Sequence, residues 1–223
     1  MGNRQSPSQG VGMRKTKLNE AQQRWVRDWW QALQPRVEGD AALPGILWAM
    51  GRGERARLRR CSDAEELLAQ AATLLLAQRL IALDGEKGSL PDTPRSYEQL
   101  AWVAGVLAMV KEDTRDGKSL VFALGNAAGN ERPKMSDLRF KSLQRATSTP
   151  DLFLHWRRAV QLNGSAADVV RLADDLLRWQ AELGQTGTRA SEGVKFQWAC
   201  DYYLSARERA ATEEPASNKE ISA

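Results

Sequence analysis

The stretch "AADVVRLADDLLRWQAEL", residues 166–183, decides the fold class of this 223-residue chain. Its apolar residues recur with the period of an α-helix and would share one side: Val169, Val170, Leu172, Ala173, Leu176, Leu177 and Trp179. Its charged residues would share the other side: Asp168, Arg171, Asp174, Asp175 and Arg178. Two oppositely charged pairs in this second set are four residues apart, a spacing that stabilises helices. We therefore predict a helix, opened by Ser165, whose charged side is solvated surface and in which Asp174 and Asp175 are not a catalytic pair.

The same helical period recurs between the two ends of the chain, where we find no convincing strand. The other predicted helices span roughly residues 20–34, 62–83, 96–112, 118–127, 136–146, 149–162 and 192–210. Several of them begin with a residue that caps helix N-termini: Asn19, Ser62 (with Glu65 in a capping box), Ser136 and Thr149. We therefore predict an all-α protein, a two-lobed helical bundle of about eight helices with flexible termini.

Changes in composition divide the chain into four predicted parts. Residues 1–17 are rich in Gly, Ser, Gln and basic residues, and residues 212–223 are acidic and polar. Neither segment could bury enough apolar surface to offset the entropy of ordering, so we predict a disordered basic tail and a disordered acidic tail. The Gly- and Pro-containing stretch 84–95 predicts a boundary between an N-terminal helical lobe, residues 18–94, and a C-terminal helical lobe, residues 95–211.

Composition also limits the class of protein. The two cysteines, Cys61 and Cys200, are far apart in the sequence and are predicted to be reduced thiols of a cytoplasmic protein. No apolar run is long enough to span a membrane, and the N-terminal residues lack the apolar segment of a secretory signal. We therefore predict a cytoplasmic protein with no membrane association. The formal net charge of +4 hints at an acidic partner.

The sequence contains few of the residue combinations that enzyme active sites use. There is one histidine, His155, and the carboxylates are scattered, so we predict no catalytic residue, no metal site and no cofactor. The stretch "DGKS", residues 116–119, looks like the end of a phosphate-binding loop, but Glu112 stands where that motif needs glycine and no strand precedes it. Seven of the eight tryptophans lie in helical patterns and are predicted to be core residues rather than base-stacking platforms.

Basic residues gather in three clusters. The first lies in "GRGERARLRR", residues 51–60, directly before an apolar helix: Arg52, Arg55, Arg57, Arg59 and Arg60. The second is opposed only by Asp137: Arg132, Lys134, Arg139, Lys141 and Arg145. The third is the pair Arg157 and Arg158. In the second cluster Lys141 and Arg145 share a helix face, whereas Arg139 points toward the apolar side.

Spacing alone leaves two interpretations of these clusters open. They could be solvated basic faces, or they could form a track for a phosphate backbone, which arginines bind with bidentate geometry.

The order of these segments resembles the CasB family, the small subunit of the type I-E CRISPR surveillance complex Cascade. The resemblance spans roughly residues 20–208 and rests on the order of its elements. An arginine-rich segment before a helix is followed by G-x-S-L-x-x-A-L, by "LRFKSLQRA", by a helix with paired arginines, and by an apolar helix that ends in "LLRW". A closing "Q-x-W-x-x-x-Y" element follows at Gln197, Trp198 and Tyr202.

The resemblance implies a fold and a role. Family members resemble two-lobed helical proteins, present in two copies per complex and without a catalytic centre. The implied partners are the other Cascade subunits, the guide RNA, and the target and displaced DNA strands. The implied function is to stabilise the R-loop and the displaced strand through basic contacts to the backbone, and we add Lys118, inside the G-x-S-L element, to the candidate nucleic-acid-binding residues. The alternative from another class is a helical protein–protein adaptor whose basic patches bind an acidic partner.

Overall fold

The computed structural model describes residues 16–36, 42–85, 88–125, 132–183 and 189–213. Most of the two predicted tails therefore lies outside the described residues. At the edges of the described ranges, the N–H group of Lys17 donates to Asp174 and the last helix continues to Glu213. The two disordered tails stay a prediction.

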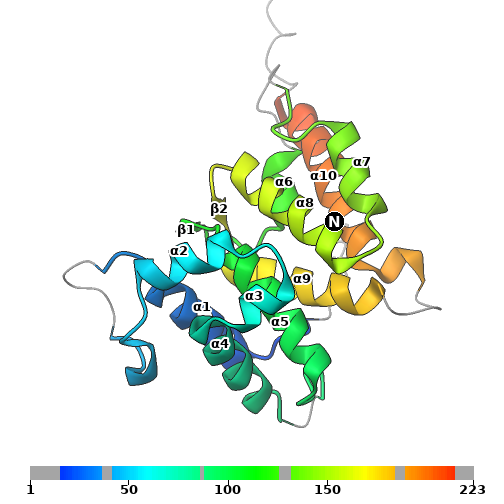
Figure 1. Cartoon of the computed structure of the whole chain (residues 1–223). Helices are drawn as coiled ribbons and strands as arrows, with labels where there is room; N and C mark the ends of the chain where they lie inside the picture. Colours follow the sequence, from blue (N-terminus) through cyan, green and yellow to red (C-terminus); the bar gives the residue numbers. More distant parts are fainter. Residues whose placement is uncertain (1–15, 37–41, 86–87, 126–131, 184–188, 214–223) are drawn as a thin grey trace, which may run out of the picture.

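Within the described residues the chain forms ten α-helices and almost no strand, which confirms the predicted all-α class (Figure 1). The helices are α1 (Glu20–Ala32), α2 (Arg52–Arg60), α3 (Ala64–Leu68), α4 (Ala71–Ala82), α5 (Pro94–Leu107), α6 (Leu120–Leu124), α7 (Asp137–Arg145), α8 (Thr149–Leu162), α9 (Val169–Leu183) and α10 (Val194–Glu213). The 3₁₀ turns are η1 (Gly45–Leu47) and η3 (Ala190–Glu192). Two short strands that the sequence did not predict, β1 (Glu112–Asp113) and β2 (Ala166–Ala167), pair in parallel.

Several helix starts follow the predicted capping chemistry. The side chains of Asn19 and Gln22 form a reciprocal capping box at the start of α1. Ser136 caps α7, as predicted. Helix α8 begins one position earlier than expected, because Ser148 rather than Thr149 is its N-cap. These side chains bind backbone N–H groups that have no partner inside the helix.

The predicted helix over residues 62–83 is divided into two in the structure. Asp63, not Ser62, is the N-cap of α3, and its carboxylate accepts from the N–H of Glu66. The backbone of Gln70 is extended (φ −96°, ψ 126°), which ends α3 and starts α4 in a new direction. Both helices pack against α5, so the break allows two short apolar faces to cover one central helix.

The prediction that the charged side of residues 166–183 is solvated is wrong. Asp174 and Asp175 are 2% and 0% exposed. Asp174 accepts from the N–H groups of Lys17 and Leu18, and Asp175 accepts from the indole N–H of Trp198. Helix α9 packs against α1 and α5 and also against α10, so its polar side is covered as well as its apolar side. The carboxylates tolerate burial because backbone, indole and guanidinium donors satisfy them.

The start of that segment also differs from the prediction. Ser165, expected to open the helix, has φ of 66°, and the following two residues form β2. Helix α9 begins at Val169, and the side chain of Asp168 accepts from the N–H groups of Val170 and Arg171. Asp168 is thus a helix-capping residue, and this explains why a carboxylate that is 6% exposed lies at this position.

The core runs through the whole arrangement. The seven tryptophans predicted to be core residues are all buried: Trp25, Trp29, Trp30, Trp102, Trp156, Trp179 and Trp198. Gly105 lets α5 approach α8, because a Cβ atom there would lie 2.8 Å from the ring of Phe153. Figure 1 shows α6, α7, α8 and α10 grouped in the upper part of the view and α1, α3, α4 and α5 in the lower part.

The lobe boundary predicted near residue 94 falls between α4 and α5. These two helices pack against each other, and one hydrophobic cluster extends from Leu18 to Tyr202. The division into two lobes stays a prediction.

Candidate nucleic-acid interface

The arginine-rich segment 51–60 is itself a helix, α2, which the sequence analysis did not predict. Leu58 is its buried side chain, whereas Arg52, Arg59 and Arg60 are exposed. Its first turn carries Glu54, whose carboxylate accepts from the N–H of Gly51. Negative charge at the start and positive charge at the end both suit the helix dipole. The helix therefore forms with little apolar surface, and it needs other contacts to hold it on the core.

Arg55 provides one of these contacts. Its guanidinium donates to the carbonyl oxygens of Ala108 (2.9 Å) and Val110 (2.9 Å), just after the end of α5, and to the side-chain oxygen of Gln34 (3.2 Å). These carbonyls lie where a helix end leaves acceptors without partners. Arg55 is half-buried and ties α2 to the end of α5.

Arg157 provides the second contact, from α8. Its guanidinium donates to the carbonyl oxygens of Arg59 and Cys61 at the end of α2, the latter at 2.8 Å. It also lies 3.7 Å from the sulfur of Met109 and 5.0 Å from the centre of the Phe153 ring. Arg157 therefore joins the end of α2 to α8 and covers an aromatic residue of the core.

The two anchoring arginines have a common electrostatic environment. Burial lowers the pKa of Arg55, and the positive charge of Arg59 lowers it further. Burial also lowers the pKa of Arg157, and Arg59 again acts in the same direction. The charges of the first and third clusters are thus close enough to repel each other. An anionic ligand beside Arg59 would relieve this repulsion.

The remaining arginines of the first and third clusters differ in whether they form ion pairs within the protein. The guanidinium of Arg57 is exposed and forms an ion pair with Glu54 at 3.1 Å. Arg158, next to the anchoring Arg157, is exposed. Among the described residues no carboxylate forms an ion pair with Arg52, Arg59 or Arg158, so these guanidiniums keep their donors for a ligand.

The second cluster lies on α7 and the segment before it. Helix α7 is held by Phe140 and Leu143, which are buried. Lys141 and Arg145 are exposed and four residues apart, as predicted, but the ammonium of Lys141 lies 2.7 Å from Asp137.

Asp137 is the centre of a small polar network on this helix. Its hydrogen bonds with Lys141 and Tyr203 lower the pKa of its carboxyl group. The same carboxylate raises the pKa of Tyr203 to about 12. The positive charge of Lys141 is therefore partly neutralised by Asp137 within the protein.

The other members of the second cluster differ in their position and in their contacts. Lys134 precedes α7 and donates to the side chain of Asn163 at the end of α8, so it does not share the helix face of Lys141 and Arg145. Arg132 is exposed. Arg139 is also exposed, although it lies four residues before the buried Leu143 and so near the apolar side of α7. Figure 1 shows α7 beside α8 and α10, apart from α2.

The "DGKS" segment forms a turn with Gly117 at φ of 68°. A strand, β1, does precede it, contrary to the sequence-based expectation, but that strand is two residues long and Glu112 is part of it. The N–H of Gly117 donates to Asp168, which shows that this turn holds the start of α9. Lys118 is exposed, and its ammonium lies 4.5 Å from the Phe122 ring.

Sequence reasoning missed the anchoring roles of Arg55 and Arg157. Their acceptors are backbone carbonyls far away in the chain, and a backbone carbonyl leaves no trace in residue identity. One signal was present for α2: glycine is tolerated at helix N-caps, and Glu54 stands three residues after Gly51, where its carboxylate can accept from the N–H of the N-cap.

Two of three comparisons relate the chain to known proteins. It matches the family model of CRISPR-associated protein Cse2 over residues 54–203. It is similar to the crystal structure of CasB from Thermus thermophilus, with a TM-score of 0.51 and 26% sequence identity over 82% of this chain and 97% of that one. The comparison with curated proteins found no match. The matched span of the family model contains every candidate nucleic-acid-binding residue except Arg52.

Proposed function

Because the chain belongs to the Cse2 (CasB) family of CRISPR-associated proteins, we propose that it is a non-catalytic subunit of a type I-E Cascade complex that stabilises the R-loop through contacts to nucleic-acid backbone. Its partners in this proposal are the other Cascade subunits, the guide RNA, and the target and displaced DNA strands, with two copies per complex.

The observation that carries the proposal is the arrangement of α2. Arg55 and Arg157 fix both the start and the end of the arginine-rich helix through backbone carbonyls. Arg59 and Arg60 remain exposed at its last turn. Arginine binds phosphate oxygens through two parallel N–H donors, so exposed guanidiniums on an anchored helix suit a sugar–phosphate backbone.

Such contacts have enough energy for the proposed role. Opening DNA by an RNA guide exchanges one duplex for another of similar stability, so modest protein contacts shift the balance. A displaced strand held by cations cannot re-pair freely, which lengthens the life of the R-loop. Sequence selection stays with base pairing, and contacts to phosphate alone meet the protein's task.

The chain's own residues support a binding role over a hydrolytic one. The arginines supply positive charge but no nucleophile and no general base. His155 lies 3.6 Å from Asp151 on the same helix, and within the described residues no thiol or hydroxyl forms a hydrogen bond with it. Asp174 and Asp175 are used as hydrogen-bond acceptors in the core. Among the described residues, no group of three metal-ligating side chains is found.

No helix within the described part of the chain has the length and apolar character needed to cross a bilayer.

Binding of single-stranded DNA across a salt series tests the proposal. Oligonucleotides of unrelated sequence should bind with similar affinity, and the affinity should fall steeply with salt, by a log–log slope of about 0.7 per phosphate contact. An adaptor that uses its basic patches for an acidic protein would bind these oligonucleotides weakly and without such a slope. Loss of binding when the oligonucleotide sequence is changed would also contradict the proposal, because contacts to the sugar–phosphate backbone do not distinguish bases.

A further inference from the structure

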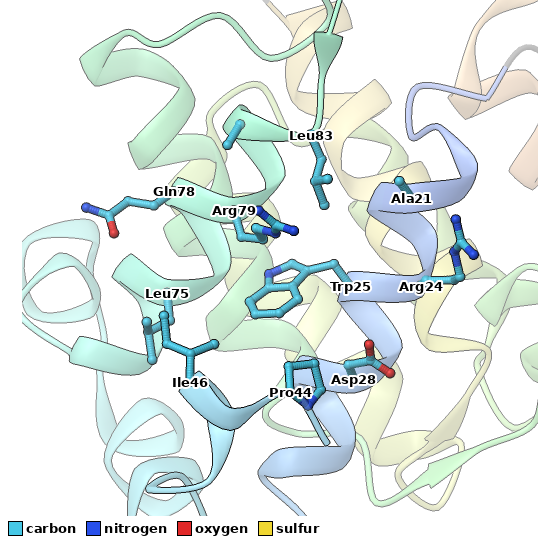
Figure 2. Close-up of a pocket in the computed structure, with 11 residues that line it drawn as sticks. Ala21, Arg24, Trp25, Asp28, Pro44, Ile46, Leu75, Gln78, Arg79 and Leu83 are labelled. Carbon is cyan, nitrogen blue, oxygen red and sulfur yellow. The ribbon is translucent and has the colours of Figure 1, made fainter. Parts of the chain in front are cut away.

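A groove of about 690 Å³ lies between α1, η1 and α4, and no residue of the basic clusters lines it. Figure 2 shows the indole of Trp25 in the middle of this groove. Pro44 and Ile46 stand on one side of it, and Leu75 and Leu83 come from α4 and its end. The groove is therefore an apolar recess with one large aromatic residue as its floor.

The turn beside the groove exposes large apolar side chains. Ile46 and Trp48 are each 62% exposed, although they flank the buried Leu47. The guanidinium of Arg36 lies 4.5 Å from the centre of the Trp48 ring and donates to the backbone of the same turn, which fixes the loop. Exposed aliphatic and aromatic residues next to a recess, with arginine nearby, are typical of protein–protein interfaces.

Charged groups stand on opposite rims of the recess. Arg24 projects from α1 and Arg79 from α4, and both are exposed. Neither guanidinium forms an ion pair with a carboxylate among the described residues. Among the described lining residues Asp28 is the one carboxylate, and its pKa is raised by burial and lowered by the charge of Arg24. The rim therefore has an excess of positive charge facing solvent.

The floor of the groove carries a donor without an acceptor. Trp25 is 7% exposed, and its indole N–H has no hydrogen-bond partner within the described residues. The guanidinium of Arg79 lies 5.9 Å from the centre of the Trp25 ring (Figure 2). Buried N–H groups in proteins are nearly always bonded, so this one calls for an acceptor. A carboxylate entering beside Arg79 would pair with that guanidinium.

We propose that this groove binds a protein segment that places one large apolar side chain over Trp25, with Asp or Glu residues on either side facing Arg24 and Arg79. The apolar walls take the anchor side chain, and the two rim cations take the carboxylates. A nucleic-acid strand fits less well. Apart from Trp25, the apolar residues among the described lining residues are aliphatic, and the two rim cations are too few to follow successive phosphates.

The partner in this proposal is another protein subunit of the complex, and to that extent the inference rests on the proposed function. The surface is separate from the basic clusters. A variant that loses the groove contact should therefore keep its affinity for single-stranded DNA.

Photo-crosslinking in the assembled complex tests the proposal. The full chain carries the photoreactive amino acid p-benzoylphenylalanine in place of Ile46 and is reconstituted with the other Cascade subunits and guide RNA. Illumination should link it to a different subunit, and mass spectrometry should locate the link beside a large apolar residue with Asp or Glu within a few positions. A link to nucleic acid, to a second copy of this chain or to a segment without acidic residues would overturn the proposal, as would the absence of a link.

Reversal of the rim charges tests the chemistry of recognition. Arg24→Glu with Arg79→Glu should lower the crosslinking yield at least about tenfold, because charge complementarity at a rim is replaced by repulsion. The matched control, Arg95→Glu with Arg189→Glu, makes the same change of charge at exposed positions elsewhere and should leave the yield unchanged. An equal loss in both double variants would show a general effect of charge and overturn the assignment.

Measurements of folding and of DNA affinity separate a failure of the groove proposal from a failure of the proposed R-loop role. Thermal unfolding identifies a charge-reversed variant that does not fold, and Arg24→Gln with Arg79→Gln then replaces it with the same expected direction. Assembly with normal DNA affinity but no crosslink refutes the groove alone. A wild-type chain that assembles and crosslinks but binds DNA without a salt slope refutes the proposed R-loop role alone. A chain that does not join the complex at all refutes both.

Discussion

The first and second basic clusters carry similar positive charge, but the helices that bear them, α2 and α7, are attached to the protein in opposite ways. Helix α7 has its own apolar side, with Phe140 and Leu143 in the core. Helix α2 has Leu58 alone and depends on Arg55 and Arg157 for its attachment. Arginine thus has two tasks at α2, anchoring the helix and facing solvent, whereas the basic residues of α7 can be changed without touching the core. Counting charges in a sequence does not separate these tasks.

The largest effect should follow from removing an anchor. Arg157→Ala takes a charged donor away from the carbonyl oxygens of Arg59 and Cys61, and it should lower the free energy of unfolding by about 2 kcal/mol, the usual range for hydrogen bonds to charged groups. Urea denaturation followed by tryptophan fluorescence measures the change. The neighbouring, exposed Arg158→Ala serves as the control and should stay within about 0.5 kcal/mol of the wild type. Equal destabilisation by both changes would remove the distinction between anchoring and free arginines.

Arg157→Lys sharpens the same comparison. Lysine keeps the positive charge but cannot donate to two carbonyls with the fixed geometry of a guanidinium. We expect it to recover only a minor part of the stability lost in Arg157→Ala. Full recovery would mean that charge alone, rather than the paired hydrogen bonds, holds the end of α2.

Removing the free charges of α2 should change binding but not stability. Arg59→Ala with Arg60→Ala should leave the unfolding midpoint nearly unchanged, because both side chains are exposed. The salt slope for single-stranded DNA should fall by about 1.4, from two lost phosphate contacts at about 0.7 each. A sharp loss of stability with unchanged affinity would show that these arginines are structural.

A smaller change in binding is expected at α7. Lys141 is paired with Asp137, so Lys141→Ala with Arg145→Ala should reduce the salt slope by about 0.7, the value for one contact from Arg145. Fluorescence anisotropy across the same salt series as for α2 gives the comparison. A reduction as large as that of the α2 double variant would mean that the ion pair opens and both clusters contribute equally.

The smallest effect is expected from the ends of the chain. A chain of residues 16–213 should fold and assemble as the full chain does, since it keeps Lys17 bound to Asp174 and all of α10. Starting at residue 18 instead would remove the Lys17 N–H donor from a buried carboxylate and should be measurably less stable. Failure of the 16–213 chain to co-purify with the other subunits would show that a tail is a docking element.

The fold was largely predictable because helix formation leaves local signals. The apolar period and caps such as Asn19 and Ser136 lie within a few residues of the helices they specify. The burial of Asp174 and Asp175 was not predictable in this way, because it depends on α10 and the N-terminal segment covering the polar side of α9. A balanced charged face looks the same in a sequence whether water or another helix covers it.

The sequence predicted which residues make up the candidate site, but not which of them anchor α2 and which are exposed. Residue types and clustering identified the arginines, yet half-buried Arg55 and exposed Arg59 look alike in the sequence. The groove around Trp25 was not predicted at all. Its walls come from segments about fifty residues apart, α1 and α4, and only the fold brings them together.

The lifetime of the R-loop tests the central claim, that exposed arginines of α2 hold nucleic-acid backbone, most directly. The reconstituted complex would carry Arg52→Gln, Arg59→Gln and Arg60→Gln, which remove three charges while Arg55 and Arg157 continue to hold the helix. We predict unchanged thermal stability and assembly, faster dissociation of the R-loop, and a salt slope lower by about 2.1 for single-stranded DNA, from three contacts at about 0.7 each. An assembled complex with the R-loop lifetime and salt slope of the wild type would contradict the claim.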